Sequence, residues 1–158
     1  EHADTEADGA ITAASNAVLA ILTADCLPIL LASCDGSRIA VVHAGWRGLL
    51  AGVIEAAVAG FQGAPLCAWI GPGIGPCHFE VGPEFKTLFP EPGLFVAKPG
   101  QRDCFDLPQA ARRMLHRAAV KRVIQSERCT VCEVDTFYSY RKEGVTGRVA
   151  SLLWRLRG

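Results

Sequence analysis

Residues 28–43 read Pro-Ile-Leu-Leu-Ala-Ser-Cys-Asp-Gly-Ser-Arg-Ile-Ala-Val-Val-His, and this stretch decides the fold. It holds two apolar runs joined by a short polar segment, and continuous apolar runs are typical of strands buried on both faces. The pair Asp35-Gly36 between them favours a tight two-residue turn. The sequence therefore predicts an antiparallel hairpin in which residues whose numbers sum to 71 face each other, and a four-residue loop closed by Ser33 and Arg38 would give the same register.

The register of this hairpin brings two chemically active side chains together. His43 falls opposite Pro28, and Cys26 lies two residues before Pro28 on the same face, so their Cα atoms should lie roughly 5.5–8 Å apart. A three-residue loop would shift the register and remove this pairing. Asp25 would alternate to the other face of a regular strand, where it could act only as an orienting group.

A thiol beside an imidazole supports two kinds of chemistry. Cys26 and His43 are either an activated nucleophile with its base, or two ligands of a transition metal such as zinc. A buried cysteine next to a hydrogen-bonded core histidine is the structural alternative, and spacing alone does not separate these interpretations.

The segment after His43 has the composition of an anion-binding helix entrance. Residues 47–61 carry an apolar stripe at helical spacing, which predicts one helix packed on the core. Gly45, Trp46, Arg47 and Gly48 stand at its start, where free backbone N–H groups and the arginine would favour phosphate or carboxylate. The alternative is that the glycines only allow tight packing and that Arg47 is a surface charge.

The remaining pattern completes a single α+β domain over residues 1–158, with mixed β-sheets and helices packed outside in layers. Further strands are expected at 18–23, 66–70, 122–125, 136–140 and 148–156, and helices at 83–88 and 107–119. A Gly- and Pro-rich loop spans 71–76.

Composition narrows the function classes. Lys+Arg and Asp+Glu number 16 each, so no basic surface indicates nucleic acid, and a small-molecule substrate fits better. No apolar run reaches membrane-spanning length, and the polar opening residues do not resemble a signal peptide. The seven cysteines, an odd number, favour a reduced cytoplasmic location.

Two other groups could carry chemistry. Cys129 and Cys132 form a C-x-x-C pair, which could be redox-active or half of a zinc site, but no second such pair exists and packed thiols are the preferred interpretation. His78 lies in the Gly-rich region, where it is interpreted as a local feature.

Four motifs carry a family resemblance. They are Thr-Ala-Asp-Cys-Leu-Pro at 23–28, His-Ala-Gly-Trp-Arg-Gly at 43–48, the Trp-Ile-Gly-Pro-Gly-Ile-Gly-Pro loop at 69–76 with Phe-Glu-Val-Gly at 79–82, and Thr-Phe-Tyr-Ser-Tyr-Arg at 136–141 with Thr-Gly-Arg at 146–148. Together they resemble the YfiH, or laccase-domain, family. The family name suggests a laccase, yet four histidines are too few for a blue copper and a trinuclear cluster.

The resemblance implies a metal-dependent purine nucleoside phosphorylase acting on adenosine, inosine, guanosine and methylthioadenosine, with adenosine deaminase activity. It implies that Cys26 and His43 bind zinc, with copper as the alternative, and that the family's third ligand, an upstream histidine, falls before residue 1. The chain thus resembles the family domain without its N-terminal part.

The expected partners are a nucleoside and phosphate, without nucleic acid or membrane, and no oligomeric state is predicted. In this hypothesis Cys26, His43 and Arg47 are catalytic, and Gly45, Trp46 and Gly48 bind substrate or phosphate. The alternatives are a Cys-His hydrolase or amidase in peptidoglycan precursor editing, or an inactive fragment.

Overall fold

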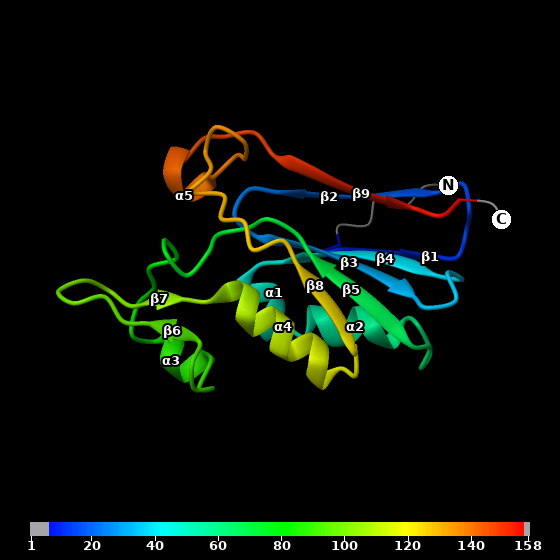
Figure 1. The fold of residues 1–158 in the computed structure, drawn as a ribbon, viewed down its shortest axis with the longest axis horizontal. Helices are drawn as coiled ribbons and strands as arrows, with labels where there is room; N and C mark the ends of the chain where they lie inside the picture. The colour runs from blue at the N-terminus through cyan, green and yellow to red at the C-terminus, as the bar shows by residue number, and fades with distance from the viewer. Residues whose placement is uncertain (1–6, 157–158) are drawn as a thin grey trace.

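The computed structural model describes residues 7–156 and has three layers (Figure 1). A five-stranded sheet forms the middle layer, three helices cover one face of it, and a two-stranded ribbon covers the other. His2, which stands in none of the four family motifs and was not predicted as a ligand, lies outside the described residues. The α+β class and the layering are as predicted, although the sequence did not predict that the second covering layer is a β-ribbon.

The central sheet is built around the predicted hairpin. Pro28 pairs with His43 and Ala32 with Ile39, so the register in which residue numbers sum to 71 is confirmed. The favoured two-residue turn is wrong: the loop has four residues, 34–37, and is closed by the Ser33 N–H donating to the Arg38 carbonyl, because the side chains of Asp35 and Ser33 accept from the Ser37 and Arg38 N–H groups. The strands are largely buried, as the continuous apolar runs indicated. All neighbours are antiparallel except the last pair. In order across the sheet, the strands are β1 (Gly9–Thr12), β4 (Ile39–Ala44), β3 (Leu27–Ser33), β5 (Leu66–Ile70) and β8 (Arg122–Gln125).

The ribbon pairs β2 (Val18–Thr23) with β9 (Val149–Trp154), which lie at opposite ends of the chain. Ile21 and Ser151 face the sheet, whereas Leu22 and Trp154 are more than half exposed on the outer face. This alternation is that of a sheet layer with one covered face.

The helical layer differs from the prediction in one respect. Residues 47–61 form two short helices instead of one, α1 (Trp46–Leu50) and α2 (Val53–Ala59). Gly52, at a φ of 79°, ends the first, because a glycine in the left-handed region closes a helix and satisfies its carbonyls. The third helix, α4 (Leu107–Arg117), begins where Asp106 accepts a hydrogen bond from the Gln109 N–H.

The remaining segments gather at one end of the sheet. Phe79, Phe85, Phe89, Phe95 and Phe105 form an aromatic cluster there. The elements that carry it or adjoin it are α3 (Phe85–Leu88), β6 (Phe95–Val96), β7 (Cys104–Phe105) and α5 (Tyr140–Glu143).

The strand predicted at 136–140 is wrong. The segment forms turns that lead into α5, because Ser139 caps that helix by accepting from the Lys142 N–H, and Phe137 N–H bonds back to Glu133. None of the helices in residues 7–156 has both the length and the apolar character needed to span a bilayer.

Candidate functional site

A cavity of about 470 Å³ lies where the ribbon, the sheet and α1 meet. It is lined by Cys26, His43 and Arg47, which the sequence predicted as catalytic residues, and by Trp46, which it predicted to bind substrate or phosphate. The other lining residues are Leu22, Thr23, Ala24, Asp25, Ile74, Phe79, Leu107, Tyr140, Arg141 and Arg148.

Cys26 sits in the short connection between β2 and β3. The chain is not a regular strand there, because Asp25 has a φ of 87° in the left-handed region. Gly45 lies directly against the thiol, and a Cβ at that position would be 2.8 Å from Cys26 Sγ. Burial, followed by the carboxylates of Asp25 and Asp8, raises the pKa of Cys26, and Arg148 opposes this shift.

His43 reaches the cavity from the end of β4. Its Nδ1 lies 3.2 Å from Oδ1 of Asp8, just before β1. If Nδ1–H donates to this carboxylate, Nε2 is the nitrogen left free for a ligand or a proton. The sequence did not predict this contact, because Asp8 and His43 are 35 residues apart.

Asp25 holds the floor of the cavity together. Its carboxylate accepts from the Thr130 hydroxyl at 2.6 Å and from the Arg141 N–H at 2.6 Å, and its carbonyl accepts from the Ile74 N–H. The side chain is buried and joins three separate loops. Asp25 is therefore a structural centre of the site, whereas the sequence had given it an orienting role at most.

Three guanidinium groups face the cavity. Arg47 stacks over Trp46, with 4.1 Å between its Cζ and the ring centroid. Arg141 lies over Phe79 and donates to the carbonyls of His78 and Glu80. Arg148, just before β9, completes the set. Cationic groups therefore outnumber the one carboxylate in the lining, Asp25, and Arg141 and Arg148 come from a part of the chain distant from Arg47.

The two predicted glycines do not line this cavity. Gly45 is the N-cap of α1 and leaves space for Cys26, while Gly48 packs near the carbonyl of His43. Because α1 is only five residues long, its dipole is small, and the arginines carry the positive charge of the site.

A second group of potential metal-ligand atoms lies on loops that adjoin this cavity. Cys77, His78, Cys129 and Cys132 bring one thiol or imidazole atom each within 4.8 Å of one another, and this cluster could bind a metal. Among residues 7–156 it alone unites three or more His, Cys, Asp or Glu donor atoms in this way; Cys26 and His43 do not belong to such a group. Sequence alone favoured packed thiols at Cys129 and Cys132 and did not reveal the cluster, because its halves are separated by about fifty residues and only one is a C-x-x-C.

The crowding of thiols shifts their ionisation. Burial and hydrogen bonds with Cys132 and Cys129 raise the pKa of Cys77 to about 12. Burial favours the neutral thiol of Cys129 and by itself would raise its pKa. Hydrogen bonds to the sulfur, first from the Gly75 N–H, outweigh the effect of burial, so the pKa of Cys129 is lowered to about 7.

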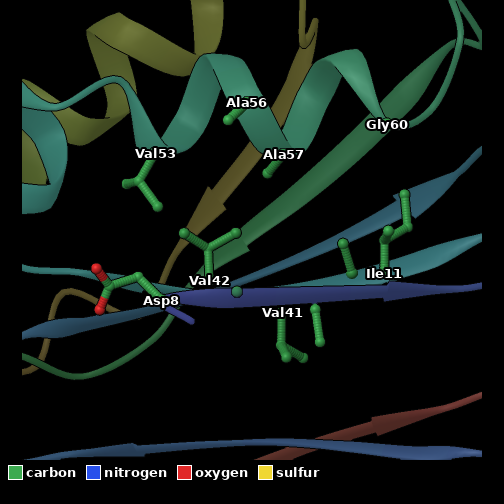
Figure 2. Close-up of a pocket in the computed structure, with 11 residues that line it drawn as sticks. Asp8, Ile11, Val41, Val42, Val53, Ala56, Ala57 and Gly60 are labelled. Carbon is green, nitrogen blue, oxygen red and sulfur yellow. The ribbon is translucent and has the colours of Figure 1, made fainter. Parts of the chain in front are cut away.

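A further cavity of about 310 Å³ lies between α2 and the β1 edge of the sheet (Figure 2). Aliphatic side chains such as Ile11, Val42 and Val53 line it, and Asp8 lies at one end, as Figure 2 shows. It offers few groups for chemistry, so the cationic cavity is the candidate active site.

Comparison with known proteins gives consistent results. The family model described as multi-copper polyphenol oxidoreductase laccase matches residues 1–156. The purine nucleoside phosphorylase YfiH of Escherichia coli is 40% identical over 159 residues, covering 97% of this chain and 65% of the relative. A purine nucleoside phosphorylase of Xylella fastidiosa is 43% identical over 94% of this chain and 60% of its own length.

Solved structures agree with these matches. The Neisseria meningitidis protein NMB0706 superposes with a TM-score of 0.89 at 38% identity, covering 96% of this chain and 66% of that chain. YlmD of Geobacillus stearothermophilus gives a TM-score of 0.86 at 32% identity, covering 95% and 61%. The chain spans about 60–65% of the length of the curated relatives described above. This chain belongs to the multi-copper polyphenol oxidoreductase laccase family, whose relatives include proteins named purine nucleoside phosphorylase.

Proposed function

We propose that this chain carries the active site of a metal-dependent purine nucleoside phosphorylase acting on adenosine, inosine, guanosine and methylthioadenosine. The observation that carries the proposal is the meeting of Cys26, His43 and Arg47 in one cavity of about 470 Å³. Relatives with this domain bear the phosphorylase name, which supports the same reaction here. All seven cysteines are free, which supports a reduced cytoplasmic setting.

The donor chemistry of the cavity fits zinc, with copper as the alternative. Cys26 and His43 would hold the ion, and the contact between His43 and Asp8 is the carboxylate–histidine arrangement that orients metal-binding imidazoles. A catalytic zinc usually keeps three protein ligands, so Cys26 and His43 would need one more donor. When bound, the metal supplies Lewis-acid activation of water or of a substrate oxygen.

The arginines provide for the second substrate. In phosphorolysis a phosphate oxygen forms a bond to the sugar carbon while the bond from that carbon to the purine nitrogen breaks, and the base leaves with a proton. Arg47, Arg141 and Arg148 would neutralise phosphate and hold it for this attack. Trp46 positions Arg47 by stacking, and Gly45 and Gly48 keep the chain close to Cys26 and His43.

Tyr140 and Phe79 offer aromatic surface for the purine. A site that activates water beside a purine would also support adenosine deamination, which we include as a second reaction of the same pocket.

A metal-free Cys-His hydrolase or amidase, as in peptidoglycan precursor editing, is the rival function. It is favoured by the presence of a potential nucleophile, Cys26, and a potential base, His43, in one cavity, and by the contact of His43 with Asp8, which could orient that base. An inactive fragment is the remaining alternative.

The test incubates the purified protein with inosine and phosphate. Release of hypoxanthine and ribose 1-phosphate is expected, and Cys26→Ala and Arg47→Ala should abolish it, whereas Cys34→Ser, an exposed thiol on the hairpin turn, should not. The rival hydrolase predicts covalent trapping of Cys26 by an electrophile in metal-free protein. No product from a protein extended upstream to family length would refute the phosphorylase.

A further inference from the structure

The ligand atoms of Cys77, His78, Cys129 and Cys132 all lie within 4.8 Å of one another, and four of their six separations are close to those of a tetrahedral zinc site. With Zn–S near 2.3 Å and Zn–N near 2.0–2.1 Å, the edges of the tetrahedron are about 3.8 Å between sulfurs and about 3.6 Å between sulfur and nitrogen. Cys77 and Cys132 place their sulfurs 3.5 Å apart. The distances from His78 Nδ1 to the sulfurs of Cys77, Cys132 and Cys129 are 3.2, 3.5 and 3.8 Å.

The backbone around the cluster is built to hold these atoms. Gly73 forms a parallel bridge with Cys129, and the Gly75 N–H donates to Cys129 Sγ at 3.2 Å. A Cβ on Gly75 would lie 3.2 Å from Cys129 Cβ, so glycine permits the close approach of the two loops. Lys98 donates to the carbonyl of Cys77 at 2.7 Å and holds that end of the first loop.

The ligand set is closed and stands apart from the candidate active site. Three thiolates and one imidazole fill all four positions of zinc, which is the pattern of structural sites, whereas catalytic sites keep a position open. None of the four residues lines the cavity of Cys26 and His43. The two loops do, however, carry Ile74 and Phe79, which line that cavity, and Thr130, which bonds Asp25.

We propose that Cys77, His78, Cys129 and Cys132 bind a structural zinc ion that clamps the loop at 71–80 to the loop at 126–133. The ion fixes the wall of the cavity without taking part in its chemistry. It forms a site separate from the Cys26 and His43 pair and does not depend on the function proposed for that pair.

The test measures metal in protein purified and handled under reducing, air-free conditions. In a Cys26→Ala background, which removes the predicted catalytic ligand, one zinc per chain should remain by elemental analysis. X-ray absorption should give three sulfur ligands at about 2.3 Å and one nitrogen at about 2.0–2.1 Å. Replacing zinc by Co²⁺ should give the visible bands of a tetrahedral thiolate complex.

Adding Cys132→Ser or His78→Ala should remove that ion and those bands. Both side chains are surface-accessible, so each variant should fold, and a loss shared by both would not be due to one misfolded protein. Cys34→Ser is the matched control and should keep the full zinc equivalent.

Unchanged zinc in both double variants would overturn the proposal, and so would absence of zinc from the Cys26→Ala protein. A Cys77–Cys132 disulfide in the air-free protein would overturn it in favour of a redox pair. Loss of the catalytic activity in Cys26→Ala alone bears only on the proposed phosphorylase.

Discussion

Gly45→Ala should separate the chemistry of the cavity from the stability of the fold. A Cβ at residue 45 would stand 2.8 Å from Cys26 Sγ, whereas ordinary non-bonded contacts lie near 3.5–4.0 Å. The sulfur must therefore move by roughly 0.7–1.2 Å, or turn to another rotamer. Because Gly45 has a φ of −81° and a ψ of 167°, alanine fits the backbone without strain.

The expected loss is large in activity and small in stability. A misplacement of about 1 Å in a catalytic group costs about 100-fold in rate, equivalent to about 2.7 kcal/mol of transition-state stabilisation. On stability, the weaker N-cap costs about 0.5–1 kcal/mol, and the reduced entropy of the unfolded chain returns about 0.4–1 kcal/mol. Steady-state phosphorolysis of inosine and urea unfolding measure the two quantities.

Gly48→Ala is the control variant, since a Cβ at residue 48 would lie 3.4 Å from the carbonyl oxygen of His43 and would not contact a thiol. It should change activity much less than Gly45→Ala. If Gly45→Ala kept wild-type kcat/KM and metal content, Cys26 would not be the group whose position matters. If both variants lost activity equally, the cause would be the helix entrance itself.

Two further perturbations test separate parts of the structure. Asp8→Ala removes the carboxylate that orients His43 and should weaken metal affinity in the cavity by about 10- to 100-fold in chelator competition, with unchanged affinity counting against the assigned contact. Burial raises the pKa of Asp106, while the hydrogen bond from the Gln109 N–H and the charge of Arg113 oppose this shift. The protonated Asp106 carboxyl therefore stabilises the fold at a pH below its unfolded-state pKa, and this contribution is lost as the pH rises through its folded-state pKa. Asp106→Asn, which keeps the cap without the charge, should therefore be as stable as wild type or more so at pH 7, and Asp106→Ala less stable by about 1 kcal/mol in urea unfolding; equal loss in both variants would contradict this account.

The sequence predicted best what depends on local pattern. The apolar runs on either side of Asp35-Gly36 predicted the hairpin register, and with it the position of His43 opposite Pro28, although the loop has four residues where two were favoured. The strand at 18–23 was likewise predicted to the residue, because a six-residue run rich in apolar and β-branched residues is shorter than a typical helix. The metal-ligand roles of Cys26 and His43 remain predictions.

What the sequence missed depends on contacts between distant segments. Ser139 and the carboxylate of Asp25 accept from the first N–H groups of α5 (Tyr140–Glu143) and so support turns at 136–139 followed by a helix, where the aromatic pattern had favoured a strand at 136–140. Cys77 and Cys129 become neighbours only because Gly73 bridges to the second loop. Propensity and spacing carry no information about such pairings, since the partners are brought together by tertiary structure.

The bonds that Asp25 makes also set the order in which the molecule can assemble. The two bonds join Asp25 to residues that are 105 and 116 positions away, whereas the outermost pair of the β3–β4 hairpin, Leu27 and Ala44, is 17 positions apart. Closing the longer loops costs about 1.6–1.7 kcal/mol more chain entropy, so the hairpin should form early and the floor of the cavity late. A nascent chain that has reached the end of β8 already holds every strand of the central sheet, yet Asp25 still lacks both partners for its carboxylate. The candidate active site is thus completed only as the last thirty or so residues fold back, well after the central sheet is in place.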